Sequence, residues 1–499
     1  MRFIVSILVL WAISLNAQVD YNENGFPWKE KTNKGPDAEV PGWYYNLGIT
    51  GMRAQLDPQN PKYLLVKYIF KKSPAYGKVQ PGDLIIKAGK YTFNTAHKDG
   101  YGMDKFGADG PVLDFAMALE DAQGWSGKGN LSITVLREGN KKNIDLNVGS
   151  SYGQYTKYFP ENCQKSDKIS KELCEYIAKN QQPNGSFGSP VENLYAPLAL
   201  MASGESKYMR NVKRNVYHQA EITNAELVKE GLTNWKYMTA GIVLSEYYLK
   251  TKDSKILKEL QEIYDFLYKS QYVDLSQLHP NQKNTHPDAT PKTKDDANGG
   301  WGHNPGFEGY GPIAMITGEG ALAFALMHKC GIKIDRDRHE RAYNFLARGT
   351  SNNGYTWYAD DSNPNNKSWA DMGRTGAGAV ANYLSPYSDT KYKKKALLQA
   401  KLIGKHPQSF PDTHGSPILG MGFTALAAHI DKDSFRKLMD NNKWWFTLAQ
   451  CHDGSFYYQP NRDNAGYGGN SRIKASAVTA FIFLMKKQNL TVTKANGSP

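Results

Sequence analysis

The residues whose chemistry best suits catalysis are concentrated in one glycine-rich stretch, WGHNPGFEGYG, which begins at Trp301. Within it, His303, Glu308 and Tyr310 can all exchange protons with a bound substrate. The glycines let the backbone turn tightly and approach a ligand closely. We therefore predict catalytic roles for His303, Glu308 and Tyr310, with Trp301 and Asn304 as substrate-binding neighbours.

Three further groups of polar residues lie in expected loops nearer the C-terminus. Asp371 and Arg374 belong to the first group, and His414 belongs to the second. We predict catalytic roles for these three residues, although Asp371 and Arg374 can equally form a buried ion pair with no part in chemistry. The third group supplies predicted substrate-binding residues, which are Tyr467, Asn470 and Arg472.

This combination of aromatic, acidic and basic side chains is typical of an extended site for a sugar polymer. Aromatic rings stack on sugar rings, and arginine binds carboxylate or sulfate groups through paired hydrogen bonds. Polysaccharide lyases use a His or Tyr base beside Asn or Arg, and this chain can supply such a set. We predict a polysaccharide lyase or glycoside hydrolase that acts on an anionic glycan. The alternative is a non-catalytic scaffold that binds peptide or glycan.

The N-terminus has the pattern of a cleaved secretory signal. Arg2 supplies a positive charge, Phe3 to Leu15 is an almost wholly apolar run, and Asn16-Ala17 precede the expected cleavage site. The run is shorter than the roughly 20 residues that a transmembrane helix needs, and we expect no membrane span elsewhere. We therefore predict a secreted or periplasmic protein after cleavage near Ala17.

The chain is basic, with 61 Lys and Arg against 48 Asp and Glu and a formal net charge of +13. Loss of residues 1–17 removes only Arg2 and leaves +12. Such a charge suits anionic partners, but an exported protein seldom meets nucleic acid. We therefore exclude nucleic acid and expect an anionic polysaccharide or an envelope surface as the partner.

Residues 160–490 have the pattern of repeated helical hairpins. Apolar residues at helical spacing predict helices at 171–180, 237–248, 257–268, 318–329 and 475–485. Asn-Gly or Asp-Gly turns followed by an aromatic residue recur at glycines 185, 299, 354 and 454, which lie 114, 55 and 100 residues apart. About 330 residues divided by a unit of about 55 gives six hairpins. We expect an all-α (α/α)6 toroid whose inner helices line a central cavity; an open helical solenoid is the alternative.

Residues 43–149 are rich in predicted strands, with one helix expected at 111–122, and residues 18–42 are expected to be an extended lead-in. The motifs Ser73-Pro74-Ala75 and Gly82-Asp83-Leu84-Ile85 resemble those of PDZ domains of the bacterial secreted type. The resemblance implies a loop that holds the C-terminal carboxylate of a protein partner, beside a strand that pairs with its peptide. The alternative is a module that only packs on its neighbour. The implied peptide-binding residues are Asn46, Leu47, Gly48 and Ile49.

The hairpin units resemble the toroids of the terpenoid-cyclase and protein-prenyltransferase superfamily. The order of signal, PDZ-like domain and toroid also resembles a family of secreted bacterial proteins of unknown function. The motifs on which the superfamily's activities depend are incomplete in this chain. Tyr358 stands where the acidic cluster of the cyclases begins with Asp. Neither Cys330 nor Cys451 has the neighbours expected of a zinc ligand in a prenyltransferase. We therefore expect neither a cyclase nor a prenyltransferase, and no metal or other cofactor.

The cysteines and one long insertion give two structural expectations. Cys163 and Cys174 flank the entry to the first helix, and export permits oxidation, so we predict a disulfide between them. The insertion from Asp274 to Asp296 is rich in Pro, Asn, His and Lys, and we expect it to form a loop that covers the cavity.

Overall fold

The contacts of the computed structural model divide the chain into two units. We call residues 1–176, 414–417 and 439–479 the sheet unit, and residues 177–413, 418–438 and 480–499 the helical unit. The sheet unit thus includes a C-terminal segment that the sequence predicted as part of the toroid. The described residues are 18–19, 22–23, 26–27, 44–97, 109–224, 231–360, 371–387, 389–411, 417–458 and 472–494.

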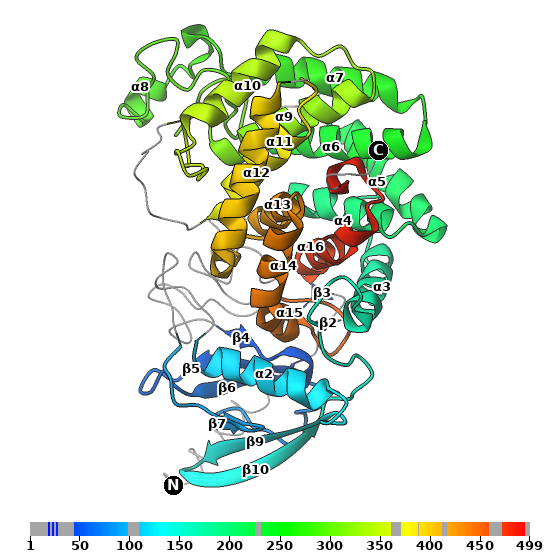
Figure 1. The fold of residues 1–499 in the computed structure, drawn as a ribbon, viewed down its shortest axis with the longest axis vertical. Coiled ribbons are helices and arrows are strands. Elements are labelled where there is room, and N and C mark those ends of the chain that lie inside the picture. Colours follow the sequence, from blue (N-terminus) through cyan, green and yellow to red (C-terminus); the bar gives the residue numbers. More distant parts are fainter. Residues whose placement is uncertain are drawn as a thin grey trace, which may run out of the picture. The chain divides into compact units, whose positions relative to one another are not determined.

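The sheet unit is built on an eight-stranded sheet with the order β10-β9-β7-β6-β5-β4, in which β8 pairs with β7 and β1 pairs with β6 (Figure 1). Only the β1–β6 pair is parallel, while β2 and β3 form a separate two-stranded ladder. The strands are β1 (Gln18–Val19), β2 (Asn22–Glu23), β3 (Phe26–Pro27), β4 (Tyr45–Asn46), β5 (Met52–Leu56), β6 (Leu64–Phe70), β7 (Leu84–Ala88), β8 (Tyr91–Thr92), β9 (Asn130–Arg137) and β10 (Asn140–Asn147).

Local sequence explains the two longest strands. Leu131, Ile133 and Val135 alternate along β9 and are fully buried, as expected for a strand with one covered face. Glu138 and Gly139 join β9 to β10 with φ of 51° and 79°. Positive φ at both positions is the condition for a tight two-residue hairpin, so this turn sets the register of the pair.

Three helical segments cover the sheet unit: α2 (Pro111–Gln123), the first part of α3 (Gln164–Lys179) and α15 (Lys443–Ala449). Proline at the first position of α2 is compatible with a helix start, because its missing N–H has no partner there anyway. The Glu120 carboxylate of α2 accepts hydrogen bonds from Lys165 of α3 and from Thr447 Oγ1 of α15, the latter at 2.8 Å. One partly buried carboxylate therefore ties α2 to both other helices.

The toroid that the sequence predicted forms the rest of the fold, and its outer helices alternate with inner ones. Outer helices such as α7 bury one face at i, i+3 and i+4 spacing, whereas the inner α9 is buried from its first residue to Met327. The helices are α4 (Pro190–Ala202), α5 (Met209–Ile222), α6 (Thr233–Thr251), α7 (Ile256–Ser270), α8 (Gln282–Thr285), α9 (Ala314–Lys329), α10 (Arg336–Arg348), α11 (Met372–Tyr383), α12 (Thr390–Lys405), α13 (Pro417–His429), α14 (Lys432–Asn441) and α16 (Arg472–Leu484).

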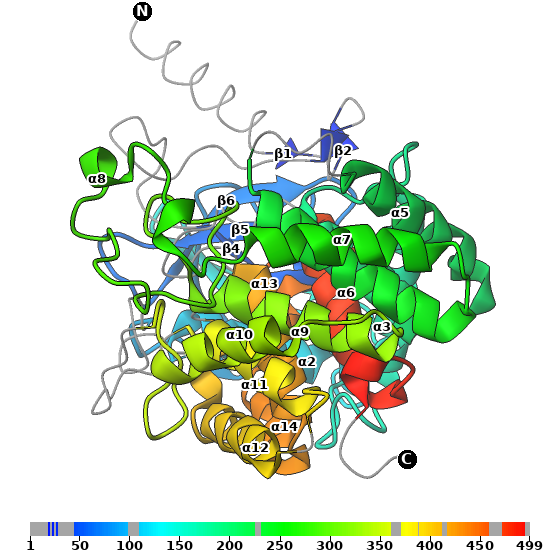
Figure 2. The same ribbon diagram turned by 90° about the horizontal axis from the view of Figure 1, so that it is seen from above.

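The inner helices approach one another very closely, and Figure 2 shows α9 with α6 and α11 beside it. Glycine makes this possible. A Cβ on Gly373 of α11 would lie 2.5 Å from the Cα of Gly420 on α13, and a Cβ on Gly422 of α13 would lie 2.1 Å from the Tyr195 hydroxyl on α4. No side chain larger than glycine fits at either contact.

A small cavity between α4, α6, α9 and α13 has a volume of about 10 Å³, enough for at most one water molecule. The cavity is lined by Leu194, Tyr195, Leu198, Ile242, Leu322, Phe423, Leu426 and Val492. The predicted site in a central cavity of the toroid stays a prediction.

Among the described residues, no helix is both long enough and apolar enough to cross a bilayer.

Candidate active site

The glycine-rich stretch lies between α7 and α9, and its first residue anchors it in the core. Trp301 is fully buried, and its indole Nε1 donates to the Leu267 carbonyl at 3.0 Å. Its backbone N–H donates to Thr317 Oγ1 on α9 at 3.0 Å. Trp301 was predicted to bind substrate, but its ring packs edge-on against Phe324 inside the helical unit. The structure thus corrects that assignment, and Trp301 positions the loop.

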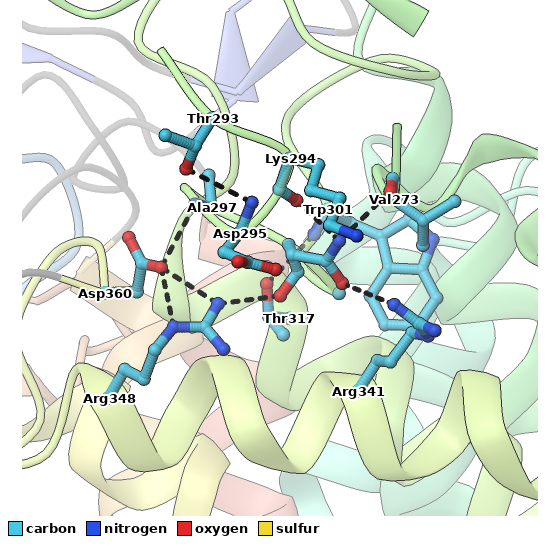
Figure 3. A network of polar contacts seen from close by, with 12 residues as sticks. Val273, Thr293, Lys294, Asp295, Ala297, Trp301, Thr317, Arg341, Arg348 and Asp360 are labelled. Atoms are coloured by element: carbon cyan, nitrogen blue, oxygen red, sulfur yellow. Dashed lines mark hydrogen bonds and ion pairs between the residues drawn. The ribbon is translucent and has the colours of Figure 1, made fainter. Parts of the chain in front are cut away.

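A polar network fastens the segment that precedes the loop to the outer helix α10 (Figure 3). Asp360 Oδ2 accepts from the backbone N–H of Ala297 at 3.2 Å and from Arg348 Nε at 3.0 Å. Arg348 Nη2 also donates to the Asn298 carbonyl at 2.7 Å, and Arg341 Nη1 donates to Asn298 Oδ1 at 3.0 Å. Asp360 lies two residues after Tyr358, in the stretch that we compared with the acidic cluster of the cyclases, and these contacts give it a structural role.

The insertion from Asp274 to Asp296 braces the same loop. The backbone N–H of His279 donates to the Phe307 carbonyl at 2.9 Å, and the buried Gln282 Nε2 donates to the Gly309 carbonyl at 2.8 Å. The His286 ring meets the exposed Tyr310 ring edge-on, with centroids 5.1 Å apart. The insertion was expected to cover a cavity, but these contacts give it the role of a support for the loop.

The loop brings His303 and Glu308 to the N-terminus of α6. Trp235 Nε1 donates to His303 Nδ1 at 2.8 Å, so a neutral His303 carries its proton on Nε2 and is a donor there. Burial lowers the pKa of His303, and the nearby Glu308 partly opposes this. Asn304 Nδ2 donates to Glu308 Oε1, and Asn304 Oδ1 accepts from the Thr233 N–H at 3.1 Å. Asn304 is thus a positioning residue for Glu308.

A second group forms where α11 begins. Asp371 is buried and has left-handed backbone angles, φ 57° and ψ 56°, a strained conformation that recurs at functional sites. Its Oδ2 lies 3.5 Å from Arg374 Nη2, which also donates to the Tyr355 hydroxyl at 3.2 Å. The Arg374 guanidinium lies over the Tyr358 ring, 5.6 Å from its centroid. The predicted pair is therefore an ion pair held between two tyrosines.

Tyr358 is influenced by both groups. Burial raises the pKa of Tyr358, Arg374 lowers it, and Asp371 and Tyr310 raise it further. Tyr310 is 72% exposed, which leaves its ring open to solvent beside the buried ion pair. We call the residues of both groups the rim site; they are Trp235, His303, Asn304, Glu308, Tyr310, Tyr355, Tyr358, Asp371 and Arg374.

Sequence reasoning missed three aromatic residues of the rim site. Tyr355 follows the Asn-Gly turn at Gly354, so the pattern of a turn followed by an aromatic residue was a usable signal for it. Trp235 lies in the first turn of α6, where no such pattern marks it. Tyr358 was considered only as a mismatch to an acidic motif, which hid its contact with Arg374.

A family model covers the rim site and most of the chain. The family described as Domain of unknown function (DUF6288) matches residues 166–493. The chain belongs to the DUF6288 family. No curated protein matches it.

Two solved structures resemble part of the chain in outline. One is an inactive variant of the α-1,6-mannanase GH76A of Salegentibacter sp. HEL1_6 with α-1,6-mannotriose, at 12% identity over 64% of this chain and 99% of that chain, with a TM-score of 0.46. The other is the GH76 α-mannanase BT2949 of Bacteroides thetaiotaomicron, at 13% identity over 65% and 95%, also with a TM-score of 0.46. Likenesses this weak carry no argument about activity.

Arg472, another predicted substrate-binding residue, is engaged within its own unit. Arg472 belongs to the sheet unit and is buried, and its guanidinium binds the Asp453 carboxylate and, at 2.9 Å, Ser455 Oγ. Asp453 Oδ1 also accepts from the Ser455 N–H at 3.1 Å. Arg472 therefore holds a turn, which corrects its assignment to substrate binding. His414, Tyr467 and Asn470 lie outside the described residues.

The implied peptide-binding loop is covered by the chain itself. Asn46, Leu47, Gly48 and Ile49 are all buried, and Asn46 Nδ2 donates to the Ala449 and Tyr457 carbonyls, each at 3.2 Å. A Cβ on Gly48 would lie 2.9 Å from the Thr447 carbonyl oxygen of α15. In this structure the loop offers no open carboxylate site, because α15 and the segment after it pack on it.

The predicted disulfide is wrong. Cys163 and Cys174 are buried free thiols. Cys163 directly precedes α3, and Cys174 lies 11 residues further along it, so their Cα atoms are separated by about 16 Å at 1.5 Å per residue. A disulfide needs Cα atoms within about 7 Å.

Proposed function

We propose that the protein is a carbohydrate-active enzyme that hydrolyses glycosidic bonds at the rim site. The observation that carries this proposal is that one loop presents His303, Glu308 and the exposed Tyr310, and that both Tyr310 and the Asp371–Arg374 pair shift the pKa of Tyr358. Glycoside hydrolysis requires two carboxyl groups that flank one bond. Glu308 and Asp371 are the carboxyl groups that the rim site offers.

The surrounding side chains suit a sugar. Tyr310 exposes most of its ring, and Trp235 and Tyr358 are partly exposed, so the site offers aromatic faces for sugar rings. His303 Nε2 is available as a donor to a sugar or leaving-group oxygen, because Nδ1 is engaged by Trp235. Glu308 is the proposed acid, and Asp371, held ionic beside Arg374, is the proposed base or nucleophile.

Hydrolysis is favoured over elimination. A lyase needs a strong base beside an unengaged cation that neutralises the uronate. Burial raises the pKa of Tyr358, which disfavours its phenolate, and the Arg374 charge is already offset by Asp371. We therefore propose a glycan whose cleavage does not depend on a uronate, and we propose that the enzyme meets it after export, as the apolar run at Phe3 to Leu15 suggests.

The test is release of reducing ends from a panel of neutral, uronic and sulfated glycans by the purified protein. We expect activity on at least one neutral glycan, with a loss of at least 100-fold (about 2.7 kcal/mol in the barrier) in Asp371→Asn and Glu308→Gln. Glu340→Gln, on the exposed face of α10, is the matched control and keeps full activity. Unsaturated ends would identify a lyase. No release from any glycan, or full activity in both variants, would overturn the proposal.

A further inference from the structure

Glu319 on the inner helix α9 is a fully buried acid for which the structure shows no partner. Its exposed fraction is zero, and neither carboxyl oxygen has a hydrogen-bond partner among the described residues. Burying an ionised carboxylate without partners is very unfavourable, so such groups normally take up a proton instead. The rim site does not use this residue.

Helix geometry places Glu319 toward the centre of the inner helices. Met315, Glu319, Leu322 and Leu326 recur at i, i+4, i+7 and i+11 and so share one face of α9. Leu322 lines the small cavity between α4, α6, α9 and α13. Glu319 therefore projects from the face of α9 that is turned to the interior, one turn closer to the N-terminal end of the helix than Leu322.

The glycines on either side of Glu319 show how little space surrounds it. A Cβ on Gly318 would lie 2.8 Å from the Cβ of Ala377 on α11. A Cβ on Gly320 would lie 2.8 Å from Met238 Cε on α6. Since α6, α9 and α11 already touch at these positions, the helices must separate before water can reach the carboxyl group.

The described ionisable groups on the elements around α9 form no hydrogen bond to Glu319. Arg374 of α11 pairs with Asp371, and Tyr195 of α4 donates to the Leu419 carbonyl. The ring of Tyr237 on α6 stacks on Phe266, and its buried hydroxyl has no hydrogen-bond partner among the described residues, Glu319 included. On the outer side, His339 Nε2 of α10 bonds the Ala321 carbonyl and the Tyr264 hydroxyl of α7 accepts from the Asp335 N–H. Burial alone raises the pKa of Glu319, to about 8.

Glu246 on α6 shows how another buried carboxyl group of the helical unit obtains hydrogen bonds. Its Oε1 accepts from the Val492 N–H at 2.7 Å and its Oε2 accepts from the Thr491 N–H at 2.9 Å. Burial raises the pKa of Glu246, but these two hydrogen bonds lower it. Glu319 has no comparable donors.

We propose that Glu319 is an internal proton-binding site that makes the packing of the inner helices sensitive to pH. The closed packing holds the neutral carboxylic acid. When the proton leaves to solvent, the carboxylate must be hydrated, and α9 must then loosen from α6 and α11. This site is independent of the proposed hydrolase activity, since it concerns the fold of the helical unit and not the rim.

The sign of the effect follows from the raised pKa. Below about pH 4.5, the ordinary pKa of a glutamic acid, Glu319 is protonated in both the folded and the unfolded chain, so its titration does not change the free energy of unfolding. Between about 4.5 and 8, only the unfolded chain ionises, so folding weakens by up to about tenfold per pH unit. Above about pH 8, Glu319 is ionised in both states, and the loss of folding stability no longer changes with pH.

The test compares the full-length protein with Glu319→Gln by thermal unfolding from pH 4 to 9. We expect the variant to gain Tm relative to the natural protein across this window, with most of the gain between pH 5 and 8. Glu246→Gln is the matched control and loses stability, because its two hydrogen bonds weaken. Hydrogen exchange should show faster opening of α9 in the natural protein at pH 9 than in Glu319→Gln. Parallel Tm profiles for the natural protein and Glu319→Gln would overturn the proposal.

A second measurement holds even if Glu319→Gln folds poorly. Infrared difference spectra of the natural protein between pH 6 and pH 9 should show the carbonyl band of a neutral buried carboxylic acid disappear. Glu246→Gln should leave that band in place. A spectrum at pH 6 without a neutral buried acid would contradict the assignment.

Discussion

The interior of the helical unit and the rim site differ in packing. The interior is made of closely packed helices, and the rim site is made mainly of the loops beside these helices. In the interior, glycine and alanine bring α9, α11 and α13 into close contact, so that an added Cβ would clash. At the rim, the chain before α9 is extended by polar loops whose groups are tied by hydrogen bonds to α6 and α10. The helix contacts are closed to any added side-chain atom, whereas the loops leave Tyr310 exposed.

The comparison shows where chemistry can reside in this fold. A side chain that needs solvent and a substrate has to lie on a loop, and a loop without support would not hold its geometry. The rim obtains that support from the core residue Trp301 and from the Asp360–Arg348 pair. The interior supplies rigidity, and Glu319, whose carboxyl group has no hydrogen-bond partner among the described residues, is suited to holding a proton instead of a substrate.

The largest expected effect tests the close packing of the interior. A Cβ on Gly376 of α11 would lie 2.5 Å from the backbone oxygen of Phe423 on α13, and backbone cannot move aside as a flexible side chain can. We expect Gly376→Ala to reduce the free energy of unfolding by about 3 kcal/mol in urea denaturation.

Gly378→Ala on the same helix is the matched control. Its Cβ would meet only the flexible ends of Gln399 and Thr356, at 3.3 and 3.8 Å. Alanine favours helix over glycine by up to about 1 kcal/mol, so this variant should be neutral or more stable. Equal losses in the two variants would contradict a packing limit that is specific to the inner contact.

The second prediction concerns the support of the rim. Asp360→Ala removes the acceptor for Ala297 and Arg348, and we expect a loss of about 1–2 kcal/mol, with faster hydrogen exchange confined to residues 297–311. Asp337→Ala removes an exposed ion pair with Arg341 on the same helix and should cost no more than about 0.5 kcal/mol. Unchanged exchange in 297–311 would show that the loop does not depend on this network.

Both kinds of helix were predicted in part. The amphipathic outer helix α7 was predicted at 257–268 and observed at Ile256–Ser270, because its apolar residues recur on one face. The inner α9 was predicted at 318–329 and observed at Ala314–Lys329, whereas the inner α11 and α13 were not predicted. Spacing of the turn glycines nevertheless predicted the number of hairpins, and hence the toroid.

The candidate site was predictable in part. His303, Glu308 and Tyr310 are adjacent in sequence and remain together, and the Asp371–Arg374 pair is one helical turn apart. Their convergence through Tyr358 depends on contacts between segments some 50 residues apart, which no local pattern encodes. Trp301 and Arg472 were misassigned because an aromatic or cationic side chain beside a glycine turn looks the same in sequence whether it faces solvent or the core.

The smallest expected effect separates the electrostatics of the rim from its packing. Trp235 Nε1 donates to His303 Nδ1, a bond that the neutral imidazole accepts and the imidazolium cannot. Trp235→Phe keeps an aromatic ring beside His303 but removes the donor, so the pKa of His303 should rise by roughly half to one pH unit toward its ordinary value. Trp357→Phe is the control, because the Trp357 indole donates to Ser351 Oγ and not to a histidine. NMR titration of the His303 ring, assigned with His303→Gln, measures the shift. An unchanged pKa in Trp235→Phe would mean that burial alone keeps His303 neutral, and the donor state at Nε2 would then no longer follow from the contact with Trp235.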